Sequence, residues 1–292
     1  MSIKYVPKDI NEETNVNVTR RNPLKNFVYL LTIVIAISIV IFFALGYAAS
    51  WLATKIGSEN ENQVGRLLYN TISEAEITDD RRIFYLDELL HSMLNVGENV
   101  RLPLTIHLID IEEANAAMMP GGHVLINTGL LQEVKSENEL AFILAHELGH
   151  FQHRDPLKSL GRSLVVVSAL ATVGIGTSSS STGLSKIVPW VGEMTISHYS
   201  RNQEKQADEY GLERVVNHYG HGNYSLGFFD RLEDSEFSQI SQYFDSHPQN
   251  QERIDHLNQL AVNKDWDMKG EITPLPNWIN CPDMDEMQCE VE

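Results

Sequence analysis

The stretch AHELGHFQHRD, residues 145–155, decides how this sequence is interpreted. Residues four apart on a helix lie on one face, so His146 and His150 can place ring nitrogens on one zinc ion, about 2.0–2.1 Å away. Glu147 projects in a neighbouring direction, where its carboxylate can take a proton from a water whose pKa zinc lowers to about 7. A solvated helix face with two unrelated histidines would give the same pattern. The motif therefore needs support from the rest of the chain.

The surrounding pattern predicts that the motif lies on a helix behind a small sheet. Ser136 can cap a helix that runs to His153 and has an apolar face, formed by Leu140, Ile143, Leu144 and Leu148. LTIHLID (104–110) alternates like a strand, and ANAAMMPGGHVLINTGLL (114–131) gives two extended runs around the turn PGG. Further helices are expected as two within 58–98, one at 200–218 and one at 249–262. The predicted fold class is α+β, mainly helical, with a loosely packed acidic tail after residue 263.

A second helix offers the third ligand that a catalytic zinc needs beside an open position. In HYSRNQEKQADEYG (198–211), Glu204 and Asp208 are again four apart. Glu204 can be the third ligand, while Asp208 can accept the outer N–H of a ligating histidine and fix its tautomer. A charged helix surface is the ordinary alternative, but two metal-compatible helices in one chain favour one zinc ion per chain.

A long apolar segment precedes this domain. No charged residue occurs between Lys25 and Lys55, and about 20 apolar residues suffice to cross a bilayer as a helix. A signal peptide cleaved after Ala48 is the alternative, and the polar leader and the long apolar core both argue against it. We expect one transmembrane helix at 27–52.

The charges beside this segment predict its orientation. Arg20, Arg21 and Lys25 crowd the N-terminal side, so the tail 1–26 should be cytoplasmic and the rest exported. This predicts a bacterial inner-membrane protein with a periplasmic domain. A mitochondrial inner-membrane protein is the alternative, but transit peptides avoid acidic residues such as those of this leader. Two cysteines near the C-terminus, Cys281 and Cys289, could pair in an oxidising compartment or remain free thiols.

Composition limits the remaining possibilities. A net charge of −18 argues against a nucleic-acid partner, which would need a basic face. A second charge-free stretch begins at Ser163, but its apolar core of about 12 residues is short for a crossing. Because both flanks must supply ligands to one zinc, we predict a non-spanning hydrophobic hairpin at 163–198. A buried helix under a loop is the alternative. The oligomeric state cannot be read from the sequence.

These motifs together resemble a known family. HELGHFQHRD followed by SRNQEKQAD is similar to the HtpX and CAAX-prenyl-protease family of zinc metallopeptidases, in the gluzincin group. NAAMMPGGHVLINTGLL (115–131) is similar to the family's edge-strand segment, and SHPQNQERI (246–254) to its His-Pro…Arg motif. The resemblance covers about residues 60–262. It departs at His153–Arg154, where the family often has Arg-His, so no role is assigned to His153.

The resemblance implies a role for each residue of the motifs. Zinc ligands would be His146, His150 and Glu204, with Glu147 as the general base and His247 near the oxyanion. It also implies a zincin-type metallopeptidase domain at 53–262, followed by the acidic tail 263–292. With one clear span, the chain is similar to anchored, exported members.

A strand edge beside the zinc could hold an extended peptide substrate by strand addition. The candidate residues are Asn115, Ala116, Ala117, Met118 and Met119. Backbone pairing tolerates many sequences, which suits an endopeptidase that cuts unfolded or misassembled envelope proteins. The alternative is a zinc-containing chaperone or adaptor with little proteolysis, although such a protein would not need a base at Glu147.

Overall fold

The computed structural model describes residues 22–70, 75–94, 100–172, 199–230, 243, 247 and 251–280. The chain divides into two compact units, Met1–Leu45 and Gly46–Glu292. Helix α1 (Pro23–Ala53) is, among the described residues, the one helix long and apolar enough to cross a membrane. This confirms the predicted apolar helix at the N-terminal end.

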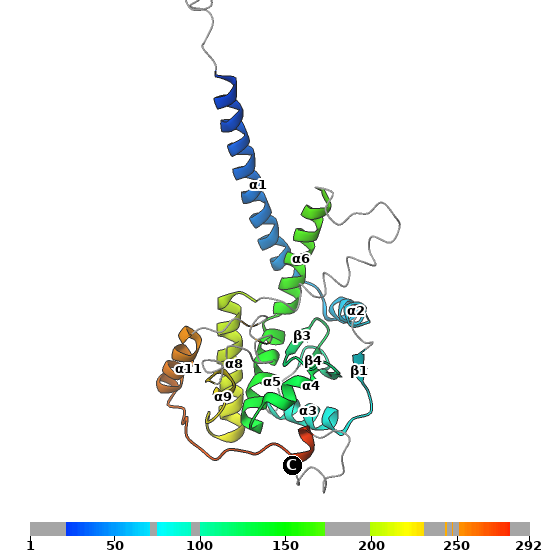
Figure 1. The fold of residues 1–292 in the computed structure, drawn as a ribbon, viewed down its shortest axis with the longest axis vertical. Helices are drawn as coiled ribbons and strands as arrows, with labels where there is room; N and C mark the ends of the chain where they lie inside the picture. The colour runs from blue at the N-terminus through cyan, green and yellow to red at the C-terminus, as the bar shows by residue number, and fades with distance from the viewer. Residues whose placement is uncertain are drawn as a thin grey trace, which may run out of the picture. The chain divides into compact units, whose positions relative to one another are not determined.

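The second unit contains a four-stranded mixed sheet (Figure 1). Its strands are β1 (Glu76–Ile77), β2 (Thr105–Ile109), β3 (Ala116–Met119) and β4 (His123–Asn127), in the spatial order β1-β2-β4-β3. β2 and β4 run parallel, and the other two pairs are antiparallel. The β3–β4 turn requires glycine because Gly121 and Gly122 have φ values of 89° and 87°. Because β3 is the last strand in the spatial order, it forms an edge of the sheet, next to the turn PGG.

Helices make up most of this unit. They are α2 (Ser58–Tyr69), α3 (Arg81–Ser92), α4 (Thr128–Glu133), α5 (Glu137–Gln152), α6 (Asp155–Thr172), α8 (Arg201–Tyr219), α9 (Gly227–Asp230), α11 (Gln251–Lys264) and the 3-10 helix η2 (Asn277–Asn280). Helix α5 lies between the sheet and α8 (Figure 1), and nearly all its residues are buried. The main hydrophobic core surrounds α5, so the HELGH segment lies at the centre of the domain.

Two glycines bring α5 and α8 unusually close together. A Cβ built on Gly149 would lie 2.9 Å from Cα of Ala207, and one built on Gly211 would lie 3.1 Å from the backbone nitrogen of His146. Any larger residue would push the helices apart. This close approach brings the side chains of α8 beside the two histidines of α5.

Side-chain caps define where these two helices begin. The hydroxyl of Ser136 accepts a hydrogen bond from the backbone N–H of Glu139, as the sequence predicted for α5. Ser200 and Gln203 form a reciprocal capping box at the start of α8. Gly220 ends α8 in the left-handed conformation, with φ of 79°.

The described residues differ from the sequence expectation in several places. Thr128–Glu133 form helix α4 instead of continuing the extended run predicted at 114–131. The two-residue strand β1, between α2 and α3, was not predicted. Residues 163–172 continue helix α6, while 173–198 lie outside the described residues, so the hairpin stays a prediction. The tail after 263 makes specific contacts near residue 280, where Ile279 is buried and the ring of Trp278 meets the ring of Tyr85 edge-on at 5.7 Å.

Polar contacts also hold this tail against α5. The backbone N–H of Thr273 donates to Oδ1 of Asn138 at 2.9 Å, and the carbonyl of Thr273 accepts from the N–H of Glu137 at 3.0 Å. Residues 263–280 are thus mostly exposed but are held against the domain at these points. Cys281 and Cys289 lie outside the described residues.

Candidate active site

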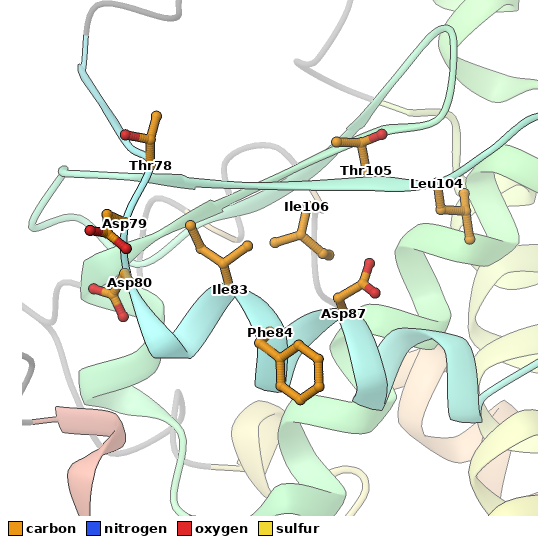
Figure 2. A pocket seen from close by; sticks show the side chains of 9 residues that line it. All are labelled: Thr78, Asp79, Asp80, Ile83, Phe84, Asp87, Leu104, Thr105 and Ile106. Carbon is orange, nitrogen blue, oxygen red and sulfur yellow. The ribbon is translucent and has the colours of Figure 1, made fainter.

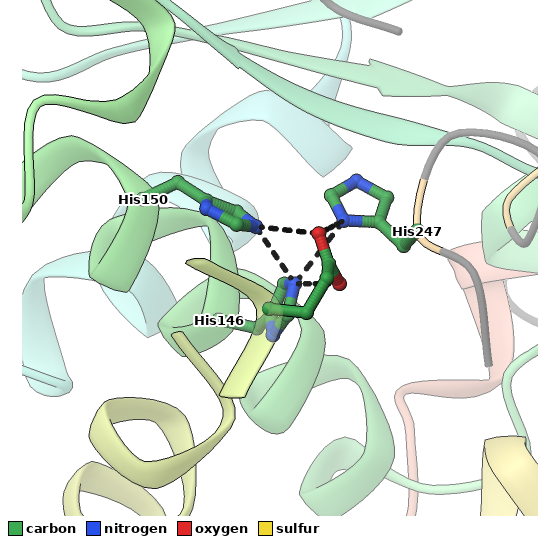
Figure 3. A group of neighbouring side chains, drawn as sticks. His146, His150 and His247 are labelled. Atoms are coloured by element: carbon green, nitrogen blue, oxygen red, sulfur yellow. Dashed lines mark hydrogen bonds and ion pairs between the residues drawn. The ribbon is translucent and has the colours of Figure 1, made fainter. Parts of the chain in front are cut away.

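Four buried side chains converge at the crossing of α5 and α8 (Figure 3). They are His146, His150, Glu204 and His247, whose candidate ligand atoms all lie within 4.8 Å of one another. The Nε2 atoms of His146 and His150 are 3.0 Å apart, and they lie 3.6 and 3.5 Å from the carboxylate oxygens of Glu204. The structure thus brings together the three ligands predicted from two helices.

His247 joins this group from a separate segment of the chain. Its Nδ1 lies 3.2 Å from Nε2 of His146 and 3.3 Å from Oε1 of Glu204. The ring of Tyr243 stacks on the His247 ring, with 4.8 Å between centroids. This places His247 among the candidate metal ligands, which was not expected from the sequence. Its role near the oxyanion stays a prediction.

Glu147 is fully buried beside the group. Within the described part of the chain, neither of its carboxylate oxygens accepts a hydrogen bond, and Oε1 lies 3.3 Å from Nε2 of His247. A buried carboxylate without donors is costly unless something else meets it. Its position suits a base that receives a proton from water or substrate.

Two further carboxylates hold the outer nitrogens of the α5 histidines. Oδ1 of Asp208 lies 3.0 Å from Nδ1 of His146, and Oδ2 of Asp155 lies 3.1 Å from Nδ1 of His150. Such contacts fix the tautomer and turn each Nε2 toward a metal. Asp208 was singled out from the sequence, whereas Asp155 was not, although it is the last residue of AHELGHFQHRD.

Arg253 lies on helix α11 and links three residues of the site. Its Nε and Nη2 donate to the two oxygens of Asp208 at 2.7 Å each, as a bidentate pair. Its Nη1 donates to the carbonyl of His247 at 3.2 Å and lies 2.9 Å from Oε2 of Glu204. Arg253 belongs to the segment SHPQNQERI, so the resemblance pointed to it without assigning a role.

The carboxylates of Glu204 and Asp208 give the site the negative charge that a bound cation needs. Burial alone would raise the pKa of Glu204, but the charge of His247 and a hydrogen bond from His150 hold it well below its usual range. Burial likewise opposes ionisation of Asp208, but hydrogen bonds from Arg253 and then His146 lower its pKa. Ionised carboxylates therefore surround the ring nitrogens.

The donor atoms fit zinc. Two imidazole nitrogens and a carboxylate oxygen are a known ligand set of catalytic zinc, and outer carboxylates on both histidines are its usual support. Burial alone would lower the pKa of His150, but hydrogen bonds to Asp155 and Glu204 raise it to about 9 in the metal-free site. A metal would replace that proton on binding.

The predicted substrate strand lies beside the site helix. β3 packs against α5, and its other long edge has no strand partner in the described ranges. All four β3 residues are buried. Asn115 directly precedes the strand, and its carbonyl accepts a hydrogen bond from the backbone N–H of Asn127. The edge position agrees with a peptide-binding role, which stays a prediction.

A separate hollow of about 380 Å³ lies between α3 and β2 (Figure 2). Its lining residues are Thr78, Asp79, Asp80, Ile83, Phe84, Asp87, Leu104, Thr105 and Ile106. Asp80 is already engaged, because it caps α3 and binds Arg82. None of the candidate ligands lines this hollow, so it is not part of the candidate active site.

Comparison with known proteins places the chain in a family. Residues 82–261 match the model of Peptidase family M48. A putative beta-barrel assembly-enhancing protease of Vibrio cholerae is 30% identical over 157 residues, which are 51% of this chain and 32% of that protein. Metalloendopeptidase OMA1, mitochondrial, of Bos taurus is 24% identical over 225 residues, 70% of this chain and 43% of that protein.

A shorter relative is matched over more of its length. Metalloprotease YcaL of Escherichia coli is 28% identical over 175 residues, 58% of this chain and 67% of that protein. The chain thus spans a third to two thirds of these relatives. The family match covers more than half of the chain and includes both helices of the site. The chain therefore belongs to peptidase family M48.

Proposed function

We propose that the protein is a membrane-anchored endopeptidase that hydrolyses unfolded or misassembled envelope proteins. The observation that carries the proposal is the convergence of His146, His150 and Glu204 beside the buried carboxylate of Glu147. Three ligands and a nearby base are the minimum that metal-assisted hydrolysis requires.

Each residue has a proposed part in hydrolysis. His146, His150 and Glu204 would hold zinc, which supplies Lewis-acid activation of water and of the peptide carbonyl when bound. Glu147 would take the proton of the attacking water and deliver it to the leaving amine. His247 would donate a hydrogen bond to the oxyanion that forms as the carbonyl is attacked.

Substrate binding is proposed along the edge of β3 that has no strand partner in the described part of the chain. An extended peptide can add to that edge through backbone hydrogen bonds, which do not depend on its sequence. Only an unfolded or misassembled chain offers such a segment readily. The name of the Vibrio cholerae relative refers to β-barrel assembly, which supports envelope proteins as the substrates here.

The proposed location is the bacterial inner membrane, with the catalytic domain in the periplasm. Support comes from the length and hydropathy of α1 and from the basic residues that precede it. The mitochondrial inner membrane is the alternative, and the Bos taurus relative is named as mitochondrial. The acidic residues of the leader favour the bacterial location.

A zinc-containing chaperone or adaptor is the competing proposal. It would need the fold and a peptide-binding edge, but no base. The buried Glu147 carboxylate accepts no hydrogen bond among the described residues and faces Nε2 of His247 at 3.3 Å, which favours catalysis, since such a group is costly in a merely structural site.

Substrate trapping tests the proposal. Glu147→Gln, expressed in the native membrane with a crosslinker, should accumulate uncleaved envelope proteins that the wild-type chain releases as fragments. Glu213→Gln, on the exposed surface of α8, is the matched control and should behave as wild type. Capture of the same uncleaved proteins by all three chains would support the adaptor and contradict the peptidase.

A further inference from the structure

We propose that residues 164–172, the distal half of α6, form a second membrane contact that enters the lipid leaflet beside the end of α1. The proposed function requires one anchor only, so this contact goes beyond it. The inference rests on the direction of α6, on its level relative to the membrane interface and on the hydrogen-bonded hydroxyl of Ser168 in its distal turns.

Helix α6 runs opposite in direction to the last turns of α1, residues 46–53, which belong to the same compact unit. At the start of α6, the guanidinium of Arg154 donates to the carbonyl of Ile56 at 2.6 Å. Seven residues later, a Cβ built on Gly161 would lie 2.8 Å from the carbonyl oxygen of Ala49. Residue numbers therefore rise along α6 as they fall along α1. The distal half of α6 therefore extends in the direction of residue 46, the N-terminal end of these last turns of α1.

The two helices are in close contact at this level. Gly161 permits the backbones to meet, and Ala53, Leu157 and Leu160 belong to one buried apolar cluster. The hydroxyl of Ser50 donates to the carbonyl of Lys158 at 3.1 Å. These contacts fix the height of α6 relative to the end of α1.

The charged and aromatic residues mark that height as the membrane interface. Trp51 and Lys55 end the apolar segment, as interface residues do. Arg162 is the last charged residue of α6, and its Nη2 donates to Oγ of Ser159 at 2.7 Å while its Nη1 lies 3.5 Å from Oγ of Ser50. The guanidinium thus lies level with the interface, and every later residue of α6 lies beyond it.

The distal turns of α6 suit lipid. Their sequence, LVVVSALAT, carries no charge, and Leu164 is 50% exposed. The hydroxyl of Ser168 donates to the carbonyl of Leu164 at 2.7 Å, so it does not need water. Thr32 in α1 does the same with the carbonyl of Val28 at 2.8 Å.

The length of this half limits its depth. Nine residues at about 1.5 Å each span roughly 14 Å, less than half of a hydrocarbon core of about 30 Å. Residues 164–172 therefore enter one leaflet without crossing. Because α6 begins at Asp155, which contacts His150, a lipid contact at its other end would hold the candidate active site at a set height above the bilayer.

Depth-dependent fluorescence quenching tests the proposal on the full chain. In a background with Cys281 and Cys289 replaced by serine, single cysteines at Leu164 and Ser168 carry an environment-sensitive dye. Leu45 in α1 gives the lipid reference, and Val262, 74% exposed on α11, gives the water reference. The vesicles contain phosphatidylethanolamine and phosphatidylglycerol, with lipids that carry a shallow or a deep nitroxide.

The proposal predicts that dyes at Leu164 and Ser168 are quenched by nitroxide lipids, as at Leu45, and not by a water-soluble nitroxide. Ser168 should respond more to the deep nitroxide than Leu164, since four residues of helix rise about 6 Å. Quenching from water alone, as at Val262, would overturn the proposal. Protection from both quenchers would overturn it as well, because protein would then cover this face. Ser168→Cys changes one atom, so a misfolded Leu164→Cys would not end the test.

Discussion

The carboxylate of Asp155 lies 3.1 Å from Nδ1 of His150, on the side of the ring opposite Nε2, which faces Glu204 at 3.5 Å. The ring is thus held between an outer carboxylate and a candidate ligand. An outer acceptor keeps the proton on Nδ1 and leaves the lone pair of Nε2 for a metal. Asp155 is the first residue of α6, so the start of one helix orients a ligand on another.

Replacing this outer carboxylate should weaken the metal site. We expect Asp155→Asn to lower zinc affinity by about 10- to 100-fold, because the amide holds the ring less firmly and makes it less basic. Chelator competition on the purified chain measures this affinity. Asp87→Asn, on α3 and outside the candidate site, is the control and should leave it unchanged. Equal affinities for all three chains would show that the contact has no supporting role.

Removing two predicted ligands should remove the metal. The double variant His150→Ala, Glu204→Ala should lose the one equivalent of zinc per chain that we expect in the wild-type protein. His153→Ala is the matched control, because His153 is also on the HELGHFQH stretch but its Nδ1 lies against the carbonyl of Gly149. Elemental analysis measures the content. A full equivalent in the double variant would exclude this ligand set.

The proposed topology predicts reporter activities. Alkaline phosphatase fused after residue 60 or after residue 265 should be active, because both points follow the single predicted span. A reporter that is active only in the cytoplasm should be silent at both. Activity of the cytoplasmic reporter after residue 265 would contradict a periplasmic catalytic domain and, with it, envelope substrates.

A histidine pair on the sheet, with His107 buried and His123 half-buried, makes stability depend on pH. Nε2 of His107 lies 2.9 Å from Nδ1 of His123, and Nδ1 of His107 lies 2.6 Å from Oε1 of Glu76. Burial, and then the charges of His107 and Arg66, lower the pKa of His123 from 6.5 to about 4. Its protonation is therefore favoured in the unfolded chain.

The sign of the effect follows from this lowered pKa. Stability should be unaffected by His123 above pH 6.5 and should fall as pH drops from 6.5 to about 4, since the unfolded chain binds the proton first. The loss should be about 1–2 kcal/mol, because the partly exposed ring is screened by solvent. His123→Gln should flatten this part of the profile, and His218→Gln, on the surface, should not. Urea midpoints of the full chain at several pH values measure both. An unchanged slope in His123→Gln would refute the assignment.

The sequence predicts those site residues that lie four positions apart on a single helix. His146 and His150, and likewise Glu204 and Asp208, are four apart on single helices, so one periodicity places each pair. Asp155 was missed because the chain turns at Arg154, whose φ is 59°, and helical spacing no longer applies there.

Contacts between segments that lie far apart in the chain could not be predicted from helical or strand periodicity. His247 enters the candidate ligand group from a separate segment. Arg253 donates hydrogen bonds both to the carbonyl of His247 and to the carboxylate of Asp208 in α8, and so links that segment to α8. Strand β1 has two residues, too few for any alternation to show. The packing of Trp278 against Tyr85 likewise depends on residues far apart in the chain.

The most direct test of the account is a paired measurement of zinc content and cleavage in the Glu147→Gln variant. The account predicts a full equivalent of zinc, because Glu147 is not a proposed ligand, together with a fall in kcat on an unfolded test protein of at least about 10²–10⁴-fold, the usual contribution of a general base. Wild-type cleavage by a variant that retains its zinc would contradict the account, because the hydrolysis would then proceed without the base assigned to it.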